Sequence, residues 1–124
     1  IQMKFNPKLK KDVEYYIEYV MIVEGQKDVI ALNNLGFERV YAIHQTSVPL
    51  KERVVQIATQ LNRKDKVCIL TDFDKKGKKL YLMLKEMFQE QGVRLDSTLR
   101  GILIKAQVSH VEGIDTFMAK IDKT

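Results

Sequence analysis

Two aspartates one residue apart, Asp72 and Asp74, closely follow the apolar run VCIL in this chain of 124 residues. A glutamate, Glu24, follows the earlier apolar run VMIV directly. Carboxylates that gather at the ends of buried strands repel one another unless a cation lies between them. A set of oxygen ligands suits Mg²⁺ or Mn²⁺. The acids therefore predict a divalent metal site, with Glu24, Asp72 and Asp74 as its ligands.

The elements that must position these acids alternate along the chain. Continuous apolar runs predict buried strands at 19–25, 38–44, 67–74 and 101–106. Apolar residues at helical spacing predict helices at 6–18, 26–35, 50–61, 77–91 and 114–121, the first of them opened by Asn6-Pro7. This order predicts one α/β domain with a mostly parallel sheet of about four strands and helices on both faces.

The topology predicts where the acids meet. In open parallel sheets, ligands bind beyond the carboxyl ends of the strands, where loops and helix N-termini converge. Glu24 and the aspartates are therefore expected at one edge, although they lie far apart in the sequence. Alternation along a strand is expected to place Asp72 and Asp74 on the same face.

The composition limits the class of protein. A hydrophobic fraction of 45% is ordinary for a globular domain and argues against intrinsic disorder. The net charge of +5 favours an anionic partner, of which nucleic acid is the commonest. No apolar run approaches the roughly 20 residues of a membrane span, so no membrane partner is expected. The single cysteine, Cys68, lies within an apolar run, and a buried thiol of this kind predicts a cytoplasmic location.

A lysine cluster directly follows the acidic pair. Positive side chains gain nothing from the helix dipole at the start of a helix, so a phosphate backbone is a better reason for them than helix stability. The alternative is a solvated, lysine-rich turn. His44, which follows the second predicted strand, is either an accessory residue of the site or a polar loop residue. The lysines expected to bind nucleic acid are Lys75, Lys76, Lys78 and Lys79.

Two segments together resemble the signature motifs of the toprim family, the domain shared by topoisomerases, primases and several nucleases. The segments are VEGQKD at 23–28 and TDFDKKG at 71–77. In that family the first motif supplies a glutamate and the second an Asp-x-Asp pair, which match Glu24, Asp72 and Asp74. The resemblance also covers Gly25, Asp28 and Gly77. It implies a toprim-like domain over 19–124, with an N-terminal helix at 1–18 packed on it in a single structural domain.

Within the family, the chain is similar to small stand-alone primase-like proteins and to the catalytic half of the nuclease that matures 5S ribosomal RNA. The segment HVEGID at 110–115 resembles a late segment of that nuclease, which would bring Glu112 towards the acidic edge. Glu112 also fits as a helix-capping acid. Family members often carry Lys or Arg where this chain has Gln26, so that basic contact is expected either to be missing or to be replaced by Lys27.

The resemblance implies a Mg²⁺- or Mn²⁺-dependent hydrolase that acts on phosphodiester bonds of RNA or DNA, as a small nuclease or RNA-processing factor. Glu24 is a candidate general acid or base as well as a metal ligand. Two other hypotheses stay open. One is a non-catalytic module that binds metal and nucleic acid and serves a primase- or nuclease-like partner, a larger replication or RNA-processing protein. The other is a flavodoxin-like phosphotransfer domain with Asp72 or Asp74 as the phosphate acceptor, which gives the lysine cluster no role.

Overall fold

A four-stranded parallel sheet forms the centre of the computed structural model, which describes residues 8–106, 108 and 110–122. The strands lie in the order β2-β1-β3-β4. At the centre of the sheet, Ile22 on β1 pairs with Tyr41 on β2 and with Ile69 on β3. The strands are β1 (Val20–Val23), β2 (Val40–Ala42), β3 (Lys66–Ile69) and β4 (Arg94–Leu95). The predicted α/β class with a parallel sheet is confirmed.

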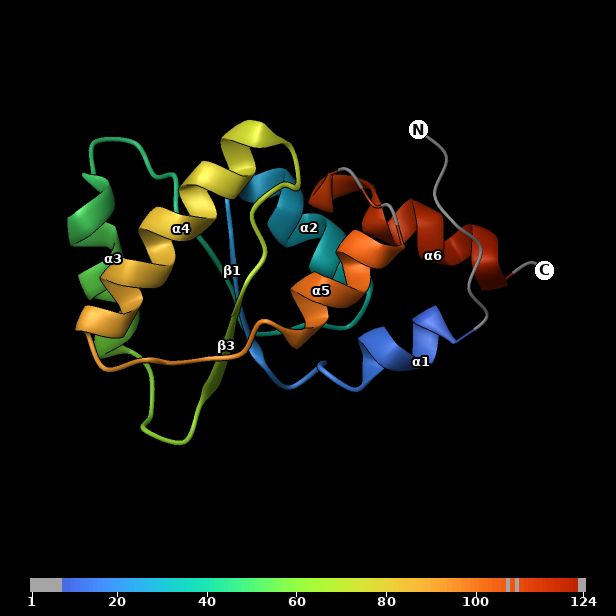
Figure 1. The fold of residues 1–124 in the computed structure, drawn as a ribbon, viewed down its shortest axis with the longest axis horizontal. Coiled ribbons are helices and arrows are strands. Elements are labelled where there is room, and N and C mark those ends of the chain that lie inside the picture. The colour runs from blue at the N-terminus through green and yellow to red at the C-terminus, as the bar shows by residue number, and fades with distance from the viewer. Residues whose placement is uncertain (1–7, 107, 109, 123–124) are drawn as a thin grey trace.

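Helices cover both faces of this sheet. In Figure 1, α3 and α4 lie on one side of β1 and β3, and α1, α2, α5 and α6 lie on the other. The helices are α1 (Leu9–Glu14), α2 (Gln26–Asn34), α3 (Leu50–Thr59), α4 (Lys75–Glu90), α5 (Thr98–Lys105), the short 3-10 helix η1 (Val111–Gly113) and α6 (Ile114–Asp122). Along the described ranges, no helix combines the length and the apolarity needed to cross a membrane.

Alternate residues of the central strands pack into two separate cores. Val20 and Ile22 of β1 belong to the cluster that α3 and α4 cover, whereas Met21 and Val23 belong to the cluster that α1, α2, α5 and α6 cover. All four side chains are fully buried. A strand that is covered on both faces reads as a continuous apolar run, which is why the sequence shows no alternation there.

The N-terminal helix shares the second of these cores. Leu9 and Val13 of α1 are buried in the same cluster as Leu99 and Leu103 of α5. Cys68 on β3 belongs to this cluster too and is 1% exposed. Burial raises the pKa of its thiol to about 12, so Cys68 acts as a small apolar side chain. The division of the chain at residue 18 stays a prediction.

The expected strand at 101–106 is wrong. Residues 101–105 lie within α5 and Ala106 is its C-cap; Leu99 and Leu103 of this helix are buried at the spacing of one helical turn. The fourth strand is β4, whose two residues pair with Lys66 and Val67 at the edge of the sheet. Two residues are too few to show a periodic pattern. The apolar run at 101–106 was therefore predicted as the fourth strand in their place.

Predicted boundaries beside the acidic pair and in the first helix also differ from the structure. β3 ends at Ile69 and α4 begins at Lys75, so the acidic pair lies in the turn between them and not on the strand. Strand alternation therefore does not position the two aspartates. The first helix, α1, ends at Glu14 and not near 18, and its expected opening at Asn6-Pro7 lies outside the described residues.

Candidate metal centre at the acidic edge

The turn between β3 and α4 closes tightly around Gly77. The Asp74 carboxylate caps α4 by accepting a 2.7 Å hydrogen bond from the Gly77 backbone N–H. The hydroxyl of Thr71, which is fully buried, donates a 2.7 Å hydrogen bond to the Gly77 carbonyl. A Cβ at position 77 would clash with the backbone of Asp72. Glycine is therefore required among the lysines of this turn.

A hydrogen bond from a backbone N–H to a side chain joins the segment at 23–28 to the segment at 71–77. The N–H of Asp72 donates to Oε2 of Glu24 over 2.7 Å. On the other side of β1, the backbone N–H of His44 donates to the Glu24 carbonyl over 3.0 Å. The carboxyl ends of β1, β2 and β3 thus converge around Glu24, while the His44 side chain is exposed.

Asp72, Asp74 and His110 form a group of candidate metal ligands in the described part of the chain. One ligand atom from each lies within 4.8 Å of the other two. Nε2 of His110 is 3.9 Å from Oδ2 of Asp74. Glu24 is not a member of this group, although it contacts Asp72. Two carboxylates and an imidazole fit a divalent cation. His110 is thus a candidate ligand beside the expected oxygen-only set, which stays a prediction; the sequence had left His110 ambiguous between an accessory residue and a polar loop residue.

The C-terminal segment reaches the site through η1. The backbone N–H of Val111, which is fully buried, donates a 2.9 Å hydrogen bond to Oδ1 of Asp72. This bond places His110 and Glu112, the neighbours of Val111, at the acidic edge. The HVEGID segment was the sequence signal for this approach, but it directed attention to Glu112 and not to the histidine.

Asp28 is a further carboxylate at this edge, and it is 7% exposed. Its Oδ2 accepts a 3.0 Å hydrogen bond from the backbone N–H of Gly25. Burial raises the pKa of Asp28; the bond from Gly25 lowers it, and the negative charges of Asp72, Glu24 and Glu112 raise it further. The acidic edge is therefore a region of concentrated negative charge, which favours the binding of a cation.

Arg100, on α5, is a buried cation that the sequence reasoning missed. Its side chain is 4% exposed and donates hydrogen bonds to the carbonyls of Thr71 (2.7 Å) and Asp72 (3.4 Å). The guanidinium also lies 4.9 Å from the ring centroid of Phe73 and 4.4 Å from that of Tyr81. Burial lowers the pKa of Arg100 from its ordinary value. This side chain fixes the backbone that carries the acidic pair.

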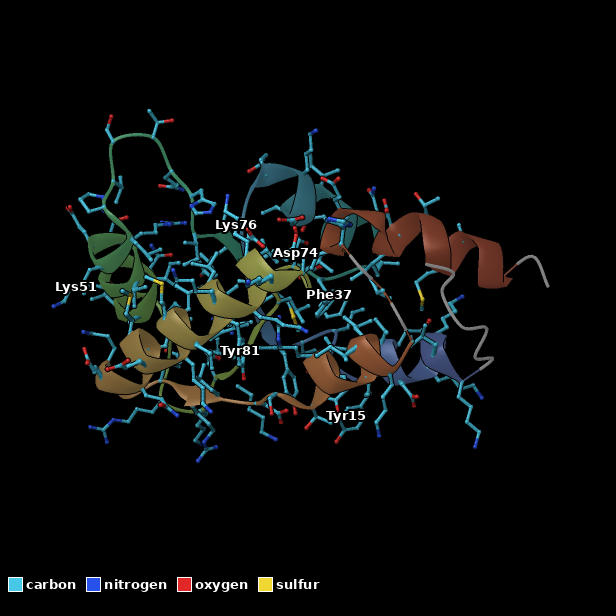
Figure 2. All side chains as sticks on the ribbon, turned by 45° about the horizontal axis from the view of Figure 1, so that its top comes forward. Tyr15, Phe37, Lys51, Asp74, Lys76 and Tyr81 are labelled. Atoms are coloured by element: carbon cyan, nitrogen blue, oxygen red, sulfur yellow. The ribbon has the colours of Figure 1, made fainter. Side chains whose placement is uncertain are left out.

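The basic residues that were expected to bind nucleic acid are exposed. Figure 2 shows Lys76 and Asp74 at the same end of α4. Lys27, on α2, lines a surface pocket together with Glu112. The first turns of α4 carry the exposed side chains of Lys75, Lys76, Lys78 and Lys79. The acidic turn and the lysine cluster are thus consecutive parts of one surface.

Comparison with known proteins shows the class to which this fold and site belong. The model of the toprim domain matches residues 18–98, which is more than half of the chain. This chain belongs to the toprim domain family. Membership of the family implies metal binding and nucleic-acid processing in general, and the suspected resemblance is confirmed.

Archaeal proteins and one solved bacterial structure are similar over most of the chain. A "UPF0292 protein" of Thermococcus onnurineus is 37% identical over 98 residues, which cover 79% of this chain and 70% of that protein. A "UPF0292 protein" of Methanocaldococcus jannaschii is 31% identical over 108 residues, covering 86% and 80%. The solved structure of a protein from Aquifex aeolicus has a TM-score of 0.71 at 26% identity, covering 88% of this chain and 97% of its own. These names state no substrate.

Proposed function

We propose that this protein binds a divalent metal ion, Mg²⁺ or Mn²⁺, at its acidic edge and cleaves phosphodiester bonds of nucleic acid. A small toprim nuclease or RNA-processing factor of the cytoplasm is the function that the site supports best. One observation carries the proposal: in a toprim chain, candidate ligand atoms of Asp72, Asp74 and His110 lie within 4.8 Å of one another beyond the carboxyl end of β3. A metal ion bound there would neutralise negative charge on the phosphate oxygens.

The backbone orients the two aspartates for this role. Asp72 uses Oδ1 to accept the N–H of Val111, and Asp74 uses Oδ1 to accept the N–H of Gly77. Each carboxylate is thereby held in place through one oxygen, so that its other oxygen is offered to a cation. Such fixed ligands need little reorganisation when charge develops on the substrate.

Glu24 is suited to handle a proton or to complete the metal site. Its Oε2 is held by the N–H of Asp72, which leaves Oε1 for a metal ion or for an attacking water. The exposed lysines of α4, with Lys27, bind the phosphate backbone on either side of the cleaved bond. Contacts with the backbone carry no base sequence, so recognition by shape is expected.

Cleavage assays with matched variants test this proposal. The substrates are structured RNA, single-stranded DNA and duplex DNA, each with Mg²⁺ or Mn²⁺. We expect cleavage by the wild type and by Glu90→Gln, which neutralises an exposed acid at the far end of α4, and loss of cleavage in Asp72→Asn and Glu24→Gln. If Glu24→Gln retains metal binding while it loses activity, proton transfer is the role of Glu24.

Two other outcomes would replace the proposal. If no substrate is cleaved but nucleic acid binds in a metal-dependent way, the chain is a binding module that acts with a partner. If the protein binds beryllium fluoride tightly in the absence of nucleic acid, a phosphotransfer domain with an aspartate acceptor is favoured instead.

A further inference from the structure

The imidazole of His110 lies at the mouth of the acidic turn. It follows α5 in the chain and directly precedes η1. Its Nε2 is 3.9 Å from Oδ2 of Asp74, which is the oxygen that the cap on Gly77 leaves uncommitted. Candidate ligand atoms of His110, Asp72 and Asp74 all lie within 4.8 Å of one another. One cation could therefore contact all three side chains.

The backbone around His110 is tied to the same site. The N–H of Val111 is bonded to Oδ1 of Asp72, and the N–H of Gly113 donates a 3.2 Å hydrogen bond to the His110 carbonyl. Val111 is fully buried, so its side chain anchors the segment in the core. The backbone at His110 is thus held by bonds of its neighbours, while its side chain is 54% exposed.

We propose that His110 supplies an imidazole nitrogen to the divalent ion that Asp72 and Asp74 hold. This inference rests on the proposed function, which places an ion between those two carboxylates. An imidazole is a good ligand for first-row transition metals, whereas Mg²⁺ prefers oxygen donors and retains its water. The mixed set of two carboxylates and one nitrogen therefore selects Mn²⁺, Co²⁺ or a later first-row ion over Mg²⁺.

The competing interpretation is an ion pair alone. A protonated His110 would attract Asp74 at the observed distance without contacting a metal, and the metal site would then hold oxygen ligands only. The two interpretations differ in whether nitrogen is bonded to the bound ion, which pulsed electron paramagnetic resonance of Mn²⁺ detects directly through coupling to ¹⁴N.

The chain offers a matched control, because it contains two histidines, His44 and His110. The experiment uses the full chain loaded with Mn²⁺. We expect imidazole ¹⁴N coupling in the wild type and in His44→Gln, and its loss in His110→Gln. Calorimetric titration should show Mn²⁺ affinity lowered at least about tenfold in His110→Gln, the lower end of the cost of removing even an outer-shell partner of a metal. Mg²⁺ affinity should change by less than roughly threefold.

The failures of the two proposals are distinguishable. Mn²⁺ that binds the wild type but not Asp72→Asn, and that shows no imidazole coupling, would overturn the role of His110 and leave the metal site in place. Coupling that persists in His110→Gln would overturn it too, because the nitrogen would then come from another group. If the wild type binds no more Mn²⁺ than Asp72→Asn does, both proposals fall. A melting curve without metal checks that His110→Gln is folded.

Discussion

The backbone N–H of Asp72 donates a hydrogen bond of 2.7 Å to the carboxylate of Glu24, a residue 48 positions earlier in the chain. β1 and β3 are neighbours in the sheet, with Ile22 paired to Ile69, so the residues that follow the two strands lie close enough for the Glu24 side chain to reach the backbone of Asp72. The carboxylate thus has two separable properties at this position, a hydrogen-bond acceptor and a negative charge.

Substitutions of Glu24 should separate these properties. Glu24→Gln keeps an acceptor for the N–H of Asp72, and we expect its free energy of unfolding to stay within about 0.5 kcal/mol of the wild type. Glu24→Ala leaves that partly buried N–H without its partner and should cost about 1–3 kcal/mol. Urea unfolding of the metal-free protein measures both. Equal stability of the two variants would show that the hydrogen bond does not hold the motifs together.

Gly77→Ala should damage the turn that carries the acids. The added Cβ would clash with the backbone of Asp72, which cannot move aside as a flexible side chain would. We expect a loss of about 1–3 kcal/mol in stability, together with weaker metal binding. Gly101→Ala is the control: it lies within α5, and its Cβ would meet nothing within 4 Å. That variant should gain up to about 1 kcal/mol, since alanine favours helices. A stable, metal-binding Gly77→Ala would contradict the proposed geometry.

Replacement of Arg100 should also destabilise the turn between β3 and α4, because Arg100 holds the carbonyls of Thr71 and Asp72. Arg100→Met removes the donor to the Thr71 carbonyl and should lower the free energy of unfolding by about 1–3 kcal/mol. Arg100→Lys keeps the charge but lacks the fork of donors that reaches two carbonyls, so its stability should lie between those of Arg100→Met and the wild type. The exposed Lys105 on the same helix supplies the control, Lys105→Met. If Lys105→Met lowers the free energy of unfolding as much as Arg100→Met does, the buried hydrogen bonds of Arg100 do not stabilise the turn.

The lysine cluster should determine the salt dependence of nucleic-acid binding. Each phosphate that a lysine neutralises adds about 0.9 to the slope of log affinity against log salt for duplex DNA, and about 0.7 for single strands. Alanine at all four lysines of the cluster should therefore make the slope shallower, by an amount set by how many of them bind phosphate. The matched control removes four exposed lysines elsewhere: Lys51, Lys64, Lys85 and Lys105. Equal slopes for the two variants would mean that only the net charge matters.

An ion pair far from the site should make stability depend on pH. Asp65 accepts two hydrogen bonds from Arg39, at 2.7 and 2.9 Å, and these, with a bond from the N–H of Asn62, lower the pKa of Asp65 to about 2. Because this pKa lies below the ordinary value of 3.8, the carboxylate stabilises the fold above about pH 4. The stabilisation is lost as the pH falls towards 2.

The measurement is a double-mutant cycle of Asp65→Asn and Arg39→Met. We expect a coupling of about 1 kcal/mol at pH 7, in the range of well-oriented surface pairs, and little coupling at pH 2. A coupling that is unchanged at pH 2 would show that the carboxylate charge contributes nothing to the pair.

The fold was predictable from the sequence because β1 and β3 are buried on both faces and therefore appear as continuous apolar runs. The motifs around Glu24 and Asp72 were recognisable because acids follow the apolar runs directly or closely, with a glycine near each motif. β4 was missed, since two residues carry no period and the sheet edge that they occupy is set by tertiary pairing. Most of α5 was mistaken for a strand because GILIKA is short and apolar, and periodicity alone does not distinguish a buried helix from a strand in such a run.

The contributions of His110 and Arg100 to the site could not be predicted in the same way. Arg100 belongs to no motif, and His110 opens the HVEGID segment, which directed attention to Glu112 instead. Each of the two residues reaches the acidic turn only through the packing of the C-terminal half of the chain. Arg100 is presented by α5, whereas the sequence predicted a strand at 101–106 and placed Arg100 on no element, so the direction of its side chain could not be inferred. The place of His110 depends on the bond between Val111 and Asp72, which no sequence spacing predicts.

Each of four carboxylates at the acidic edge accepts a hydrogen bond from a main-chain N–H: Glu24 from Asp72, Asp28 from Gly25, Asp72 from Val111 and Asp74 from Gly77. A main-chain donor is supplied by any residue except proline. Gly25 and Val111, which present two of these donors, can therefore change during evolution without loss of the arrangement, provided that the backbone path, the acids and Gly77 are kept. Distant homologues should consequently be found by their acids and glycine, and not by overall identity.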